Sequence, residues 1–213
     1  MPVVTEERKI GGIVPPPVWP GDGGGGEGWN DPGSSFPVSK GQLGLWVLLT
    51  GIIMLFAGLS SAYIVLRGVP SWQNIALPSL LWPNTVVLIL SSFTIELSRR
   101  AVSRNRLDTM KTWLAVSGAL GVAFVAGQVA AWRQLVNAGV YLPSTLQSSF
   151  FYVLTGLHGL HLVGGIAALS YVFMKALKNR LTVFNHEPLK LCATYWHFMD
   201  ALWVYLLLLL LLS

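Results

Sequence analysis

Five long stretches of apolar residues dominate the sequence and constrain its fold more than any other feature. A helix that crosses the hydrocarbon core of a bilayer needs about 20 consecutive, mostly apolar residues. The stretches that meet this requirement lie at approximately residues 42–66, 80–97, 112–136, 146–174 and 191–212. We therefore predict an all-α fold, a polytopic membrane bundle of five transmembrane helices that occupies residues 41–213.

The composition supports a membrane environment, because only 11% of the residues are charged and 53% are hydrophobic. Soluble domains carry about 25% charged residues, so this chain lacks the polar material that a water-facing surface requires. The 14 basic residues do not form a continuous stripe and therefore do not indicate nucleic-acid binding. The single cysteine, Cys192, excludes an intramolecular disulfide and a thiolate-based zinc or iron–sulfur site.

The first 40 residues differ in character from the rest of the chain. They contain the run Pro15-Pro16-Pro17 and four glycines at residues 23–26, and they lack the apolar core of a signal peptide. Such a composition cannot bury enough apolar surface to fold. We predict that residues 1–40 form a disordered, Gly/Pro-rich cytoplasmic tail.

Basic residues gather in two of the four loops between the predicted spans. They are Arg99, Arg100, Arg104, Arg106 and Lys111 in one loop and Lys175, Lys178, Arg180 and Lys190 in the other. The loops at residues 68–79 and 137–145 contain no charged residue. Because cytoplasmic loops retain Lys and Arg, the sequence predicts a cytoplasmic N-terminus and a C-terminus outside.

Small residues line parts of two spans and predict helix packing. In lipid, helices associate where small residues allow their backbones to approach closely. The helix-packing residues that we predict are Gly44, Gly51 and Gly58 in the first span and Gly156, Gly159, Gly164 and Gly165 in the fourth. The same faces can also accept a lipid acyl chain or a helix of a partner subunit.

Ionisable side chains within the spans are costly and are therefore functional candidates. The fourth span contains His158 and His161, and the fifth contains His197 and Asp200. Helical rise places Asp200 at a depth from which it could approach His161. Three interpretations remain open: a polar clamp between the last two helices, a site for a phospholipid headgroup or a proton-exchanging partner, and heme ligation by His158 or His161 with His197.

Other chemistry is not indicated by the sequence. Glu96 has Arg99 and Arg100 three and four residues away, which predicts a local ion pair. There is no phosphate-binding loop and no nucleophile with a base at a recognisable spacing. We predict neither a catalytic residue nor a metal ligand on this chain.

Several short motifs occur in a fixed order along the spans. They are Leu45-Trp46, Met54–Gly58 and Ser61–Tyr63, then Asn84-Thr85 and Ser91-Ser92, then Leu120-Gly121, Phe124, Gly127-Gln128 and Trp132, then Phe150–Tyr152, Thr155–His161 and Gly164-Gly165, and finally Tyr195–Phe198, Asp200 and Trp203. In this order they resemble subunit III of the heme-copper terminal oxidases, the cytochrome c oxidase subunit III family, over residues 40–213. The chain is similar to the five-helix bacterial form, which lacks the first two helices of the longer form.

This resemblance implies a non-catalytic accessory subunit of a proton-pumping respiratory oxidase that reduces oxygen to water in the bacterial cytoplasmic (inner) membrane. The family implies hemes and copper on the catalytic subunit I, no redox metal on this chain, and bound phospholipid. Lipid or subunit-interface contacts are expected at His158, His161, Trp196, His197 and Asp200. One position departs from the family, because Ile52 replaces the glutamate that usually lies two residues before the methionine matched by Met54.

Four other functions are compatible with the sequence. Two belong to similar complexes: an accessory subunit of a nitric oxide reductase and one of a quinol oxidase. Two belong to different classes: a heme b-binding, quinol-oxidising membrane anchor and a small-solute transporter. A Soret band from the isolated chain would indicate the anchor, and solute uptake by the chain alone in liposomes would indicate the transporter.

Overall fold

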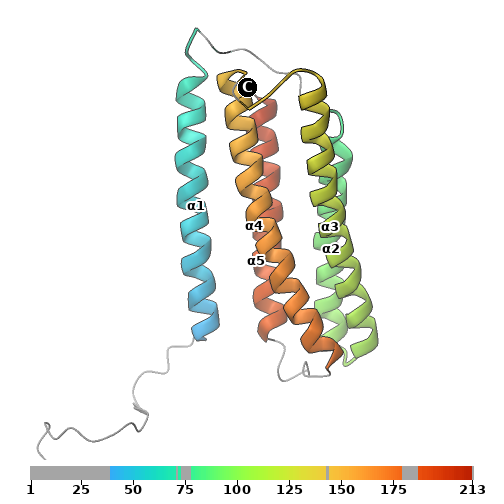
Figure 1. Cartoon of the computed structure of the whole chain (residues 1–213). Coiled ribbons are helices and arrows are strands. Elements are labelled where there is room, and N and C mark those ends of the chain that lie inside the picture. The colour runs from blue at the N-terminus through green and yellow to red at the C-terminus, as the bar shows by residue number, and fades with distance from the viewer. Residues whose placement is uncertain (1–38, 71, 73–77, 143, 179–186, 213) are drawn as a thin grey trace, which may run out of the picture. The chain divides into compact units, whose positions relative to one another are not determined.

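The structure is a computed structural model that describes residues 39–70, 72, 78–142, 144–178 and 187–212. These residues form helices and connecting turns, with no strand among them. The helices are α1 (Lys40–Leu66), α2 (Leu81–Ser103), α3 (Leu107–Asn137), α4 (Leu146–Leu177) and α5 (Glu187–Leu211) (Figure 1). The predicted tail, apart from its last two residues, lies outside the described residues.

Each of the five helices is long and apolar enough to cross a membrane, which confirms the predicted fold class. The chain is an integral membrane protein. The helices are longer than the predicted spans mainly at the ends that carry charge: α2 continues to Ser103, α3 begins at Leu107 and α5 begins at Glu187. A hydropathy criterion detects only the apolar segment, whereas the helix continues into the interfacial region, where Lys and Arg side chains reach water.

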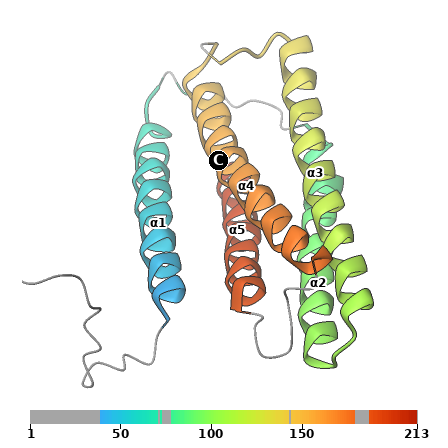
Figure 2. The ribbon, with the colours of Figure 1, turned by 60° about the horizontal axis from the view of Figure 1, so that its bottom comes forward.

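The helices alternate in direction, so that α1, α3 and α5 begin at the end of the bundle where α2 and α4 finish (Figure 1). We call this the basic end, because Arg99, Arg100, Arg104, Arg106 and Lys190 lie there. Helix α5 is central and contacts α1, α2 and α4. Helix α1 lies at one edge beside α4 and α5, and the α2–α3 pair lies at the other edge (Figure 2).

Local signals define several helix ends. The Ser39 hydroxyl accepts a hydrogen bond from the backbone N–H of Gln42 and so caps α1. Thr145 and Ser148 form a reciprocal capping box at the start of α4. Between α2 and α3, Asn105 adopts a positive φ of 55°, and the N–H of Arg106 donates to the carbonyl of Ala101. This left-handed residue allows the chain to reverse within a few residues.

Aromatic residues form much of the core. The largest fully buried side chains are those of Trp196, Trp203, Tyr63, Phe56, Phe124 and Phe151. The Phe124 and Trp203 rings meet edge to face with their centroids 5.0 Å apart, which joins α3 to α5. Tyr63 of α1 packs in the same manner against Phe150 of α4 at 5.7 Å. These contacts fix the positions of α4 and α5, which carry the predicted site.

Candidate functional site

His161 lies in the wall of a groove between α1, α4 and α5. Its Nδ1–H donates to the carbonyl of Leu157 at 2.7 Å, and its ring packs edge to face on Phe56 of α1 at 5.9 Å. The Tyr195 hydroxyl donates to the His161 carbonyl at 2.8 Å and so links α5 to α4. The histidine therefore lies where three helices meet.

This groove, which we call the α1–α4–α5 groove, has a volume of about 620 Å³. Its wall includes Leu45 and Leu48 of α1, Leu160, His161 and Tyr171 of α4, and Leu191, Cys192 and Tyr195 of α5. Ligand-sized cavities typically measure about 300–1,000 Å³. The size and the mostly apolar wall are suited to a hydrocarbon chain.

His158 is in a different environment from His161, although both are on α4. Its side chain is fully buried, and neither ring nitrogen has a hydrogen-bond partner among the described residues. Its ring lies 5.0 Å from the Trp203 ring and 6.1 Å from the Phe124 ring, measured between centroids. The arrangement places this imidazole within the packed core and away from the groove wall.

Trp196 and Trp203 anchor α5 to α2 through their indole nitrogens. Trp196 donates to the Ser91 hydroxyl at 2.9 Å, and Trp203 donates to the Thr85 hydroxyl at 2.9 Å. A buried indole N–H requires such an acceptor, because an unpaired donor in an apolar environment is costly. The two pairs fix the rotation and height of α5 against α2.

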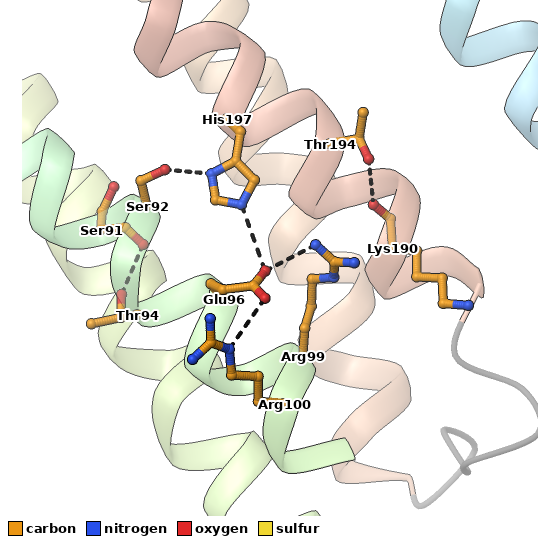
Figure 3. Close-up of polar contacts among 9 residues, drawn as sticks. All are labelled: Ser91, Ser92, Thr94, Glu96, Arg99, Arg100, Lys190, Thr194 and His197. Atoms are coloured by element: carbon orange, nitrogen blue, oxygen red, sulfur yellow. Dashed lines mark hydrogen bonds and ion pairs between the residues drawn. The ribbon is translucent and has the colours of Figure 1, made fainter. Parts of the chain in front are cut away.

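His197 belongs to a polar network on the α2 side of α5, shown in Figure 3. One ring nitrogen lies 2.5 Å from the Ser92 hydroxyl, and the other lies 3.9 Å from a carboxylate oxygen of Glu96. Glu96 also pairs with Arg99 at 2.9 Å and with Arg100 at 3.4 Å. The predicted local ion pair is confirmed, and the sequence did not reveal that His197 adjoins it.

Asp200 is buried, and its carboxylate makes no hydrogen bond of normal geometry within the described residues. The Ser92 hydroxyl of α2 lies near it. Neither a hydrogen bond nor an ion pair joins Asp200 to His161 in this part of the chain. The approach that helical rise made conceivable is therefore not found, because His161 faces α1 whereas Asp200 lies toward α2.

The predicted packing glycines fall into two groups. A Cβ atom added to Gly165 would lie 2.9 Å from the Tyr195 ring, so α4 and α5 approach closely there. A Cβ at Gly44, Gly51, Gly58, Gly156, Gly159 or Gly164 would meet no atom within 4 Å in the described residues. A packing role for these six stays a prediction, and the partner would have to come from outside this part of the chain.

Two glycines that the packing prediction omitted make the closest approaches. A Cβ at Gly121 would lie 2.8 Å from the Trp196 ring, and one at Gly127 would overlap the amide of Asn84. That amide donates to the Phe124 carbonyl at 3.1 Å and ties α2 to α3. Both glycines occur in the motifs of the third span, so their motif positions were the available signal.

The five predicted site residues do not converge on one point. His161 faces the groove, His158 and Trp196 lie in the core, and His197 and Asp200 lie toward α2. No group of three His, Cys, Asp or Glu side chains arranged to hold a metal ion is found among the described residues. The rings of His158 and His197 lie in separate environments, which does not favour a shared heme.

Comparison with known proteins gives a consistent result. Residues 34–212 match the family model described as cytochrome c oxidase subunit III. A probable cytochrome c oxidase subunit 3 of Mycobacterium tuberculosis is 32% identical over 168 residues, which cover 76% of this chain and 83% of that protein. Cytochrome c oxidase subunit 3 of Thermostichus vulcanus is 32% identical over 172 residues, which cover 77% of this chain and 83% of that protein. The corresponding protein of Alkalihalophilus pseudofirmus is 28% identical over 169 residues.

Proposed function

The chain belongs to the cytochrome c oxidase subunit III family, and from this premise we propose that it is a non-catalytic accessory subunit of a proton-pumping heme-copper respiratory oxidase. In this role it buries a face of catalytic subunit I, which carries the hemes and copper, and stabilises it while oxygen is reduced to water. The match to the family over residues 34–212 is the observation on which the proposal depends.

Exposed apolar surface supports association with other subunits. Helix α1 turns large side chains away from the bundle, among them Val47, Met54 and Val65, each about 70% exposed. The glycines Gly44, Gly51 and Gly58 lie open on the same helix. In a membrane, such a face accepts either lipid or another helix. We assign it to contact with the oxidase.

Lipid holding is the second part of the proposed function. The α1–α4–α5 groove offers an apolar wall that accommodates an acyl chain, and His161 offers a polar group within that wall. His197 and Asp200 lie toward α2. They would contribute to lipid holding indirectly, through contact with a partner subunit or by fixing the position of α5.

We further propose that the protein lies in the bacterial cytoplasmic membrane, with its basic end inside and its C-terminus outside. Arg99, Arg100 and Lys190 at this end follow the bias of cytoplasmic loops toward Lys and Arg. The accessibility of an introduced cysteine, Val140→Cys, to a membrane-impermeant thiol reagent in closed vesicles tests this orientation. Labelling of this cysteine from the cytoplasmic side would contradict it.

Purification through an affinity tag on this chain tests the principal proposal. We expect the heme-copper catalytic subunit of a cytochrome c oxidase to co-purify, with its heme spectrum, and the chain alone to be colourless. Co-purification with a nitric oxide reductase or a quinol oxidase would contradict the assignment. A Soret band from the chain alone, or solute uptake by it in liposomes, would place it in another class.

A pair of histidine variants tests lipid holding. His161→Leu changes the groove wall, and we expect the purified oxidase to retain less phospholipid with an unchanged heme spectrum. His158→Leu is the matched control on the same helix, because that ring lies in the core. Lipid retention that is equal in the wild type and in His161→Leu would remove this role.

A further inference from the structure

A second groove lies between α3 and α4, and nothing in the proposed function uses it. The two helices diverge toward the end of the bundle opposite to the basic end (Figure 1, Figure 2), and a cavity of about 260 Å³ lies between them. We call it the α3–α4 groove. Its wall includes Phe124, Gln128 and Trp132 of α3 and Gly156, Gly159 and Val163 of α4.

Gln128 lines this groove with an amide group that has no hydrogen-bond partner among the described residues. The side chain is 3% exposed, and neither its nitrogen nor its oxygen is paired in this part of the chain. An unpaired polar group is costly in an apolar environment, and the core of a bilayer holds no water that could pair it. The amide therefore indicates a binding partner from outside the described residues.

Two glycines of the groove leave room for the backbone of another helix. A Cβ atom added to Gly156 or Gly159 would meet no atom within 4 Å in the described residues. The two glycines are three residues apart and therefore lie on one face of α4. Beside them, Leu160 and Val163 are 66% and 49% exposed. In a membrane, small residues in such a setting allow a second helix to approach closely.

A phospholipid does not supply a partner for the Gln128 amide. Gln128 lies nine residues before the end of α3 at Asn137, which corresponds to about 14 Å of helical rise. The headgroup region of a bilayer is about 5–8 Å deep on each side, so a headgroup does not reach this depth. An acyl chain does reach it, but the chain carries neither a hydrogen-bond donor nor an acceptor.

A polar side chain on a neighbouring helix has the chemistry that this amide requires. The amide offers two N–H donors and a carbonyl acceptor, whereas a quinone ring offers acceptors alone. The backbone of a membrane helix is already hydrogen-bonded to itself, so the contact has to come from a side chain. Among the described residues, no charged side chain lines the groove. An uncharged partner, Ser, Thr, Asn or Gln, therefore matches it.

We propose that the α3–α4 groove receives a transmembrane helix of another subunit of the oxidase, and that the Gln128 amide hydrogen-bonds to a Ser, Thr, Asn or Gln side chain of that helix. The helix packs its backbone against Gly156 and Gly159. This contact is separate from the one assigned to α1, because the lining of the groove comes from α3 and α4. The inference rests on the proposed function, which supplies an assembly with further transmembrane subunits.

A photo-crosslinker at the rim of the groove tests the proposal within the purified oxidase. Benzoylphenylalanine is introduced in place of Val163, and mass spectrometry identifies the chain and the residue that it captures. We expect a transmembrane helix of another subunit, with a Ser, Thr, Asn or Gln within one helical turn of the captured residue. Capture of lipid alone, capture of a second copy of this chain, or no capture of another chain would each overturn the proposal.

Gly159→Leu and Gly164→Leu form a matched pair of variants on α4. Both positions have open space beside them, but Gly159 lines the α3–α4 groove whereas Gly164 lines the α1–α4–α5 groove. We expect Gly159→Leu to abolish the crosslink from residue 163 and Gly164→Leu to retain it. A crosslink that persists in Gly159→Leu, or that is lost equally in both variants, would contradict helix docking in this groove.

Gln128→Leu separates recognition of the partner from folding of the chain. Leucine needs no hydrogen-bond partner, so the free energy of unfolding of the isolated chain should stay unchanged or rise. The dissociation constant of the captured subunit, measured by dilution of the complex in detergent, should rise about fivefold, the effect of one interhelical hydrogen bond. Replacing the polar residue of the partner helix with alanine should give the same loss, with no further loss in the double variant. A less stable isolated chain with unchanged affinity for the subunit would show that the amide serves this chain alone.

The proposed function can fail independently of this groove. If the chain co-purifies with a different complex and residue 163 captures a helix of that complex, the functional assignment is wrong and the recognition by Gln128 stands. If the chain co-purifies with an oxidase and residue 163 captures no helix, only the groove inference is wrong. Val163 is exposed, so the variant with the crosslinker is expected to fold.

Discussion

Helices α1 and α5 have similar lengths, 27 and 25 residues, but very different surroundings. In the most apolar window, 44% of the α5 residues are buried within the chain, against 22% for α1. Helix α5 is fixed by two indole hydrogen bonds to α2 and by a close approach to Gly165. Helix α1 contacts its neighbours through one face and leaves Gly44, Gly51 and Gly58 open.

The difference separates two kinds of information in one sequence. The residues of α5 specify how this chain folds, because their partners are on the other four helices of the same chain. The exposed residues of α1 have no partner among the described residues, and under the proposed function they contact the oxidase. Substitutions in the two helices should therefore affect different measurements, the free energy of unfolding for α5 and association with the oxidase for α1.

The largest effect is expected for Trp196→Ala. This change removes a fully buried indole and leaves a cavity beside Gly121, at a cost of about 3–5 kcal/mol in the free energy of unfolding. Denaturant titration of the detergent-solubilised chain measures it. The control is Trp82→Ala, because Trp82 is 59% exposed and its removal should change the free energy of unfolding little. Equal losses for both variants would contradict the assigned burial.

A glycine pair gives the next largest difference. In Gly127→Ala the new methyl group would overlap the Asn84 amide, so we expect a loss of about 1–3 kcal/mol. In Gly51→Ala the methyl group meets no atom within 4 Å, and higher helix propensity should leave the chain as stable or up to about 1 kcal/mol more stable. If a partner helix packs on α1, Gly51→Ala should reduce co-purification with the oxidase more than Gly127→Ala does. Equal free energies of unfolding for Gly127→Ala and Gly51→Ala would contradict the difference in packing between these two positions.

Thr85→Val should destabilise the chain by about 1–2 kcal/mol, because it leaves the buried Trp203 indole N–H without its acceptor. Thr50→Val on α1 makes the same change at an exposed site, where the hydroxyl only donates to the Trp46 carbonyl one turn earlier. Thermal unfolding monitored by tryptophan fluorescence compares the two variants. A smaller loss for Thr85→Val than for Thr50→Val would remove the anchoring role of this hydrogen bond.

The smallest effect is expected for Glu96→Gln. The carboxylate pairs with Arg99 and Arg100 at partly exposed sites, and such pairs contribute less than about 1 kcal/mol. The effect should diminish further at high salt, because mobile ions screen exposed charges. Unfolding measured at low and high ionic strength checks this. A loss that is large and independent of salt would show that the contact with His197 carries more weight than the arginine pairs.

The helices were predictable because the bilayer requires long apolar segments, and this signal is carried by each segment alone. Helix ends were harder to predict. Helix α3 begins five residues before its predicted span, in a region where Asp108 and Lys111 lower the hydropathy. The ion pair of Glu96 was predictable because its partners lie within one helical turn.

Contacts between distant segments were harder to predict. The pairs Trp196–Ser91 and Trp203–Thr85 join residues more than 100 positions apart, and span patterns do not give the rotation of one helix against another. His158 and His161 lie three residues apart and share a helix, yet one faces the core and the other the groove. A small rotation about the helix axis decides whether such a side chain faces the core or the groove.

The short connection between α2 and α3 has a consequence for assembly. Because Asn105 reverses the chain within a few residues, these two helices can pair through contacts that are close in sequence, which form faster than distant ones. The pair is complete once residue 137 has been synthesised, before α4 and α5 enter the membrane. Helix α5 would then dock last, onto acceptors at Thr85 and Ser91 that the earlier helices already present.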